Sequence, residues 1–269
     1  MQIVNGELVS VDKSDLTIGG QIFVPDGVTA ISARSFTAVR DILTGVVLPD
    51  SLAIIGVETF YGCSNLRVVS TGNGCKAIEA MAFQYCHSLF EVKLGRNIEY
   101  IGPCAFAGCT QLEFINLPEG LRDFCWGAFF NCFRLHNLLK IPSTVTYFGK
   151  GAFHSISAKS PLKNYKAFTI TKTGKYKCLD KEYQIGKKAF VKGDLTMCQN
   201  GLHFCTDLFE LFDYYDGTYG KDFVVAEVET FGEVLTSNSS KCCARGIIPK
   251  RILSREEVIK LLNREEIDA

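Results

Sequence analysis

The residues of this sequence that are most able to bind a metal or take part in a reaction lie in its second half, around His203. The run Cys198-x4-His203-x-Cys205 combines thiols with an imidazole, which are the ligands that zinc prefers. The remaining ligand of a four-coordinate site would have to come from Cys178, Cys242 or Cys243. The alternative is that His203 lies in a core strand and that the cysteines fill small apolar spaces. The sequence has no Cys-x-x-Cys pair, so we expect neither a metal nor another cofactor.

The same half offers residues for a nucleotide-like ligand. A strand, then a helix that carries Tyr214 and Tyr215, then a strand near residues 224–228 loosely resembles the order of elements in ADP-ribosyltransferases. That resemblance implies an Arg or His in an early strand and a glutamate in a late one. The expected early strand at residues 176–178 has neither Arg nor His. The candidates for this acid are Glu227, Glu229 and Glu233. The sequence therefore favours a protein that is not an enzyme. A small-ligand site at His203, Tyr214, Tyr215 and Glu227 remains the alternative.

Twelve cysteines are many for 269 residues, and four of them recur at a fixed step. Cys63, Cys86, Cys109 and Cys132 are 23 residues apart, so they occupy one repeated structural position. The first residues show neither the basic region nor the apolar run of a secretory signal. We therefore expect reduced, buried thiols and a cytoplasmic location, with a disulfide framework as the alternative.

A longer repeat surrounds these cysteines. A small residue followed by phenylalanine occurs six times at intervals of 23 or 24 residues. The six aromatic residues are Phe36, Phe60, Phe83, Phe106, Phe129 and Phe153. A period of this length is typical of stacked units, each of which buries its apolar face only against its neighbours. Val39 and Ile156 replace the cysteine in the first and last units, as terminal units require.

Each unit predicts two short strands and a turn. Residues 112–117 end in the alternation of a strand, and Tyr100-Ile101 predicts a second extended piece. A proline or glycine follows the first strand and turns the chain. These residues are Pro25, Pro49, Gly72, Gly95, Pro118 and Pro142.

The pattern Ile/Leu-Pro-x-x-Val-x-x-Ile-Gly-x-x-Ala-Phe-x-x-Cys-x-x-Leu-x-x-Ile resembles the BspA-type leucine-rich repeat over about half of the chain. The resemblance implies a short right-handed solenoid with a parallel β face, and members of that family are typically adhesion or interaction proteins. We expect this solenoid, with its N-terminal cap, at residues 1–158, and a small α+β domain at residues 159–269. The fold class of the whole chain is then α+β.

A protein partner would bind on the exposed face of the solenoid sheet. Alternation places Val69, Val92, Ile115 and Leu139 inside the solenoid. The outward columns are Val68, Glu91, Phe114 and Leu138, and then Ser70, Lys93, Asn116 and Lys140. Apolar side chains exposed together often mark an interaction site. The alternatives are that the second domain covers them or that they have no role.

The sequence of the second domain predicts several strands and two helices. The repeat stops after Phe153, and a polar stretch from residue 155 to 164 forms the connection. Strand-like segments lie at residues 167–171, 176–179, 188–191 and 223–229. Apolar spacing predicts a helix at residues 207–215, and Ser254 with Glu257 forms a capping box that begins a second helix.

The second domain also resembles a known family. Segments such as Cys198-x-x-Gly-Leu-His-Phe-Cys205 and Val225-Ala-Glu-Val-Glu-Thr-Phe-Gly look like an uncharacterised domain frequent in phage-encoded proteins. That resemblance names no activity, but it implies a phage or prophage gene. A repeat surface in such a gene suggests binding to a host protein, such as a defence factor, in the host cytoplasm.

Composition excludes other partners. The formal net charge is zero, whereas a nucleic-acid-binding surface normally needs a basic excess. The sequence shows no apolar run of the length that spans a membrane. We therefore expect a protein-binding module. The alternatives are a nucleotide-binding or ADP-ribosyltransferase-like enzyme in the second domain and a structural virion component.

Overall fold

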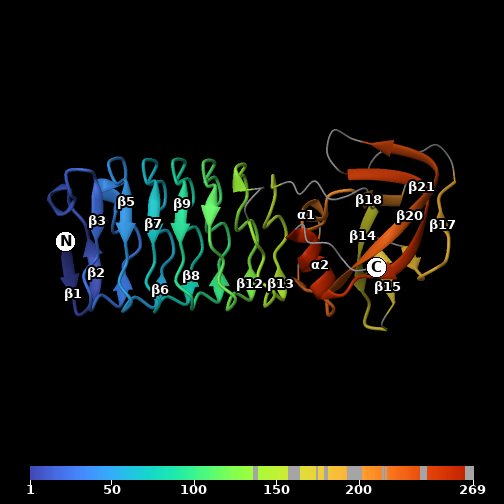
Figure 1. The fold of residues 1–269 in the computed structure, drawn as a ribbon, viewed down its shortest axis with the longest axis horizontal. Coiled ribbons are helices and arrows are strands. Elements are labelled where there is room, and N and C mark those ends of the chain that lie inside the picture. Colours follow the sequence, from blue (N-terminus) through green and yellow to red (C-terminus); the bar gives the residue numbers. More distant parts are fainter. Residues whose placement is uncertain are drawn as a thin grey trace. The chain divides into compact units, whose positions relative to one another are not determined.

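The computed structural model describes residues 1–135, 139–156, 164–173, 175–178, 181–192, 202–213, 215, 217–236 and 241–263. The chain divides into two compact units, Met1–Ile156 and Ser157–Ala269, and each is described by itself (Figure 1). The first contains the repeats, and the second contains most of the sequence's candidate chemistry.

The first unit is a solenoid whose coils each add one short strand to two parallel sheets (Figure 1). The first sheet contains β3 (Gln21–Phe23), β5 (Gly45–Val47), β7 (Val68–Ser70), β9 (Glu91–Lys93) and β11 (Phe114–Ile115). The second sheet contains β6 (Ile54–Ile55), β8 (Ala77–Ile78), β10 (Tyr100–Ile101), β12 (Asp123–Phe124) and β13 (Tyr147–Phe148). The solenoid and its parallel strands are confirmed, and the second extended piece of each repeat forms a sheet of its own.

The N-terminal coil differs from the others. The strand β1 (Gln2–Val4) pairs antiparallel with β2 (Glu7–Ser10), which pairs parallel with β4 (Ala30–Ile31). Two 3-10 turns follow these strands, η1 (Lys13–Asp15) after β2 and η2 (Thr37–Val39) after β4. This hairpin lies at the N-terminal end of the first unit and covers the beginning of its apolar stack.

The repeated phenylalanines form a continuous buried stack through the first unit. All six side chains are 0–1% exposed, and consecutive ring centroids lie 4.5 to 6.3 Å apart. The repeated cysteines form a parallel buried column, in which the thiols of Cys86, Cys109 and Cys132 donate to phenylalanine carbonyls of the preceding coil at 3.1–3.2 Å. The cysteines in the described part of the chain are free thiols, and the four repeated ones are buried, as the repeat predicts.

The tight turns depend on backbone geometry that the repeat pattern did not reveal. The residue two before each repeated phenylalanine has a positive φ, including non-glycine residues such as Glu58 (53°) and Met81 (56°). A second such position lies two residues after the phenylalanine, as in Tyr85 (61°) and Asn131 (60°). Each coil therefore reverses direction on both sides of its phenylalanine.

The second unit is built on an antiparallel sheet. Its strands are β14 (Asn164–Ile170), β15 (Tyr176–Cys178), β16 (Lys181–Tyr183), β17 (Ala189–Phe190), β18 (Leu202–Cys205), β20 (Phe223–Thr236) and β21 (Lys241–Ile252). The order is β16-β15-β14-β18-β21-β17, and β20 pairs with both β14 and β21. A short strand β19 (Gly217–Thr218) precedes β20.

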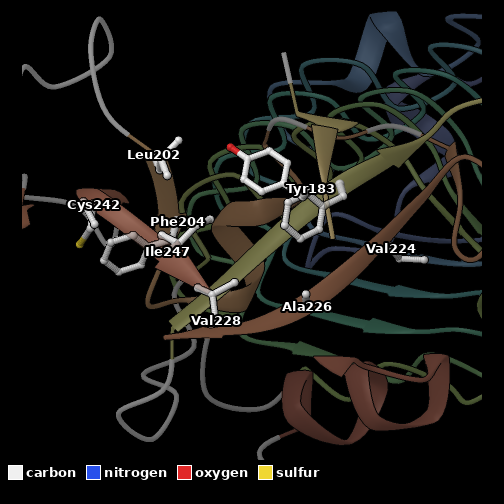
Figure 2. Close-up of a cluster of buried hydrophobic side chains, with 10 residues drawn as sticks. Tyr183, Leu202, Phe204, Val224, Ala226, Val228, Cys242 and Ile247 are labelled. Carbon is white, nitrogen blue, oxygen red and sulfur yellow. The ribbon is translucent and has the colours of Figure 1, made fainter. Parts of the chain in front are cut away.

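One apolar cluster holds these strands together (Figure 2). It contains Phe168 from β14, Phe204 from β18, Val228 from β20 and Ile247 from β21, and Tyr183 from β16 packs with them. The cluster draws on strands far apart in sequence, so no local pattern could have shown it.

The two helices of the second unit differ in how closely they follow their prediction. The helix α2 (Arg255–Leu262) has the expected capping box, in which Ser254 Oγ accepts from Glu257 N at 3.1 Å. The other helix is shorter than the predicted residues 207–215, because α1 covers only Leu208–Leu211. The side chain of Asp207 caps this helix, and Phe212 and Asp213 already make the shorter-range bonds of a 3-10 turn. The strand β20 is longer than the predicted residues 223–229.

Candidate functional site

The outward column predicted for a protein partner lies on the first sheet. Val68, Glu91 and Phe114 are in register on β7, β9 and β11, and their inward neighbours on the same strands are buried. Val68 and Phe114 are each 38% exposed, and Phe114 packs edge-on against Phe90 at 5.0 Å. Leu138 lies outside the described residues.

The polar residues of this face are partly engaged with one another. Lys93 Nζ lies 3.4 Å from Glu91 Oε1, which is an exposed ion pair on one strand. The amide of Asn116 accepts from Leu94 N at 2.8 Å and donates to Leu94 O at 3.0 Å, so it ties two coils together. Ser70 is half-buried and Lys140 is exposed. This face therefore combines apolar side chains with the charges of Glu91, Lys93 and Lys140.

The first sheet carries two further exposed apolar residues that the sequence analysis missed. Phe23 is 57% exposed on β3, and it lies in register with the exposed Val47 on β5. Both occupy the column of Ser70 and Lys93. Extending the strand alternation toward the N-terminus would have found them.

A different surface lies on the turn segments that lead from the second sheet back to the first. Its exposed aromatic residues, which we call the aromatic edge, are Tyr61, Tyr85, Trp126, Phe130 and Phe133. Tyr61 packs edge-on against Tyr85 at 5.7 Å, and Phe130 stacks on His154 at 4.6 Å. The sequence analysis did not predict this surface. For Tyr61, Tyr85 and Phe130 the signal was present one or two positions after the repeated phenylalanine, whereas Trp126 and Phe133 lie at other positions of their coil.

In the second unit, His203 lies on β18 and pairs across the sheet with Cys243 of β21. The side chain is half-buried, and burial lowers its pKa, as do the charges of Lys166 and Lys241. The proposed metal partner Cys198 lies outside the described residues. Among the residues that are described, no three His, Cys, Asp or Glu side chains gather as a metal site.

The tyrosine predicted to bind a ligand makes internal contacts. Tyr215 Oη donates to Ala167 O at 2.8 Å and lies 3.4 Å from Cys178 Sγ. Burial raises the pKa of the Tyr215 phenol well above its usual range. Tyr214 lies outside the described residues.

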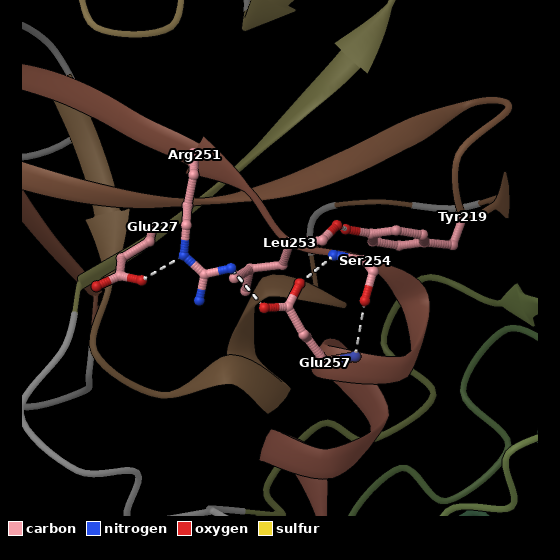
Figure 3. Close-up of polar contacts among 6 residues, drawn as sticks. All are labelled: Tyr219, Glu227, Arg251, Leu253, Ser254 and Glu257. Carbon is pink, nitrogen blue, oxygen red and sulfur yellow. Dashed lines mark hydrogen bonds and ion pairs between the residues drawn. The ribbon is translucent and has the colours of Figure 1, made fainter. Parts of the chain in front are cut away.

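Glu227 belongs to a polar network that joins the sheet to α2 (Figure 3). Arg251 Nε lies 3.3 Å from Glu227 Oε2, and the same guanidinium pairs with Glu257. Glu257 in turn accepts from Ser254 N at 2.6 Å. These contacts give Glu227 a structural role, because they hold the first turn of α2 against β20 and β21.

The structure reveals a buried lysine that sequence reasoning overlooked. Lys166 on β14 is 3% exposed, its Nζ donates to His203 O at 2.5 Å, and it lies 5.5 Å from the ring centre of Tyr183. Burial lowers the pKa of this amine. An amine with a lowered pKa can act as a nucleophile if a substrate reaches it. A hollow of about 280 Å³ lies nearby in sequence, at residues 175–176 and 182–185, but Lys166 does not line it.

A membrane-spanning helix does not occur in the part of the chain that the structure describes. The described helices of eight residues or fewer are far too short for that role.

Comparisons with known proteins agree with this architecture. Residues 29–159 match the BspA type Leucine rich repeat region in six copies. Residues 162–261 match the Domain of unknown function (DUF7666). The comparison with curated proteins gives no match.

Several solved structures are similar to the chain. A leucine-rich repeat protein from Eubacterium ventriosum is 20% identical, with 63% of this chain and 50% of that chain covered and a TM-score of 0.47. A leucine rich cell surface protein from Faecalibacterium prausnitzii is 19% identical, with 62% and 57% covered and a TM-score of 0.41. The T. pallidum leucine-rich repeat protein is 26% identical, with 51% and 76% covered and a TM-score of 0.40.

The matched part of this chain spans only about half the length of the first two solved proteins. The family matches, by contrast, cover most of both compact units. The chain is a BspA-type leucine-rich repeat region of six copies followed by a DUF7666 domain.

Proposed function

We propose that the repeat region binds a partner protein through its first sheet. Leucine-rich repeat domains generally mediate protein interactions, and this one is a solenoid whose parallel strands present a regular face. The observation that supports this choice is the in-register column of Val68, Glu91 and Phe114. Exposed apolar side chains beside the Glu91–Lys93 ion pair and the charge of Lys140 suit a partner with an apolar patch and a polar rim.

The proposal extends to the source of the partner. The resemblance of the second domain to a domain frequent in phage-encoded proteins supports a host protein as the target, met in the host cytoplasm. A right-handed coil, which the repeat family implies, is part of the same proposal.

The test compares the full-length chain with Phe114→Asp in affinity purification from host cells, read by mass spectrometry. A carboxylate at this end of the column would be desolvated in the complex without an opposite charge, so we expect the bound protein to be lost. The matched control is Ile54→Asp, which changes an exposed apolar residue on the second sheet. Retention of the same partner by Phe114→Asp, or its equal loss with Ile54→Asp, would contradict the proposal.

A further inference from the structure

Four consecutive turn segments of the repeat region contain no charged residue. Residues 59–66, 80–89, 102–112 and 125–133 contain no Asp, Glu, Lys or Arg, although these types make up 22% of the chain. The exposed positions in these segments are Tyr61, Asn65, Tyr85, His87, Trp126, Phe130 and Phe133. The four segments therefore present rings, amide and imidazole groups, and charged residues such as Glu58, Arg134 and Lys150 lie just outside them.

The aromatic edge is held rigidly by contacts between coils. A Cβ at Gly108 would lie 2.8 Å from Tyr85 Cδ1, so the glycine leaves room for the Tyr85 ring over the next coil. His87 Nδ1 lies 3.0 Å from Gly108 O.

The backbone beneath these side chains is also paired. Phe83 N donates to Ala105 O and Phe106 N donates to Ala128 O, each at 2.8 Å. Tyr61 and Phe130 stand three coils apart, which is about 14 Å at the spacing of neighbouring strands. The rings of Tyr61 and Tyr85 pack edge-on at 5.7 Å, whereas residues 102–112 of the next coil carry no exposed ring. The rings are held in place before a ligand arrives, so that a ligand need not order them.

This chemistry discriminates among ligands. Nucleic acids and acidic polysaccharides need basic side chains, which the four segments lack. A protein surface of ordinary composition would have to bury charged side chains here without opposite charges. A sugar ring, by contrast, offers apolar C–H groups that pack on aromatic faces and hydroxyls that pair with neutral amides and imidazoles.

We propose that the aromatic edge binds a strand of an uncharged polysaccharide. The distance from Tyr61 to Phe130 suits several consecutive sugar units, with rings at both ends of the site. The site is separate from the first-sheet column to which the proposed function assigns a protein partner, so either can fail without the other.

Trp126 provides a direct assay, because it is the single tryptophan of the chain and is 58% exposed. The full-length protein would be titrated with cello-, laminari-, xylo-, manno-, malto- and chito-oligosaccharides. We expect at least one series to shift Trp126 emission to shorter wavelength and to protect it from acrylamide quenching. The affinity should be the same at low and high salt, since no ion pairs are involved.

Variants separate the edge from the rest of the surface. Tyr61→Ser with Tyr85→Ser should weaken binding by about tenfold or more, as loss of two ring contacts implies. Phe23→Ser is the matched control, because it removes an exposed ring from the first sheet, and it should bind normally. Thermal unfolding of each variant verifies that the fold is intact.

Three results would overturn the proposal. The first is that no uncharged oligosaccharide changes Trp126 emission. The second is that Phe23→Ser weakens binding as much as the edge variants. The third is that only acidic oligosaccharides or a protein bind in a manner that depends on Tyr61 and Tyr85.

Discussion

Two glycines in the turns of the repeat region are fixed by backbone contact between successive coils. A Cβ at Gly72 would lie 2.3 Å from Pro49 O, and one at Gly95 would lie 2.2 Å from Gly72 O. Both glycines stand where other repeats have proline. The missing prolines thus reflect coils packed too closely for any side chain at these positions.

Gly95→Ala should therefore destabilise the repeat region by roughly 2–3 kcal/mol, because the backbone must shift to admit the methyl group. The measurement is guanidinium unfolding followed by Trp126 fluorescence. Gly120→Ala is the matched control, since its Cβ would meet nothing nearer than Ile98 O at 3.5 Å. That variant should be neutral or stabilised by up to about 1 kcal/mol. Equal stability of the two variants would refute the close-packing explanation.

The buried thiols make stability depend on pH. Burial raises the pKa of Cys63 to about 12 and that of Cys75 to about 11. Both thiols stay protonated in the folded state when those of the unfolded chain ionise. Their stabilising contribution is complete below the unfolded pKa and is lost as pH rises toward the folded pKa.

Between about pH 9 and pH 11, each such thiol should reduce the free energy of unfolding by about 1.4 kcal/mol per pH unit. Cys63→Val removes one titrating group and copies Val39, which fills the same position in the first coil. Its unfolding free energy, measured across this range, should fall less steeply than that of the parent. An unchanged slope would show that Cys63 does not contribute to alkaline unfolding.

At the scale of elements, α2 is attached to the sheet through its first turn. Ser254 and Glu257 satisfy each other's backbone N–H groups, and Arg251 links Glu257 to Glu227 on β20. Tyr219 Oη donates to Leu253 O at 2.6 Å just before the helix begins. The cap thus serves both the helix and its placement on β20 and β21.

Ser254→Ala should cost about 1 kcal/mol, the usual effect of losing an N-cap. Hydrogen exchange of the α2 amides would then be roughly five times faster. Glu256→Gln serves as the control, because Glu256 is exposed and pairs with its neighbour Arg255. If both variants exchange α2 at the parent's rate, the capping box does not limit opening of this helix.

The contrast between the helices shows which elements a sequence reveals. The beginning of α2 was predictable because a capping box involves only nearby residues. The end of α1 was not, because Tyr215 leaves the helix and donates to Ala167 on β14. Lys166 and Glu227 likewise acquire their surroundings from strands distant in sequence. The sequence therefore identified candidate residues of the second unit by their chemical type, but it could not predict which contacts they make in the fold.

For the whole molecule, the regular part of the fold was predictable because one period controls it. The phenylalanine, cysteine and strand positions each recur with the coil, so a single alignment locates them all. The aromatic edge escaped notice because its members occupy different positions within their coils. The antiparallel pairing in the second unit has no period, so its strand order could not be read from the sequence.

In a stack of this kind, the loss of stability caused by a mutation should depend on whether the mutated coil is internal or terminal. Phe106 packs between Phe83 at 5.1 Å and Phe129 at 5.3 Å, whereas Phe36 stacks on Phe60 at the N-terminal end of the series. Phe106→Ala should cost about 3–5 kcal/mol, the range for a fully buried phenylalanine. Phe36→Ala should cost less, because it interrupts one interface between coils rather than two. Trp126 fluorescence during guanidinium unfolding measures both variants, and equal losses would show that the first unit is stabilised as a single core instead of coil by coil.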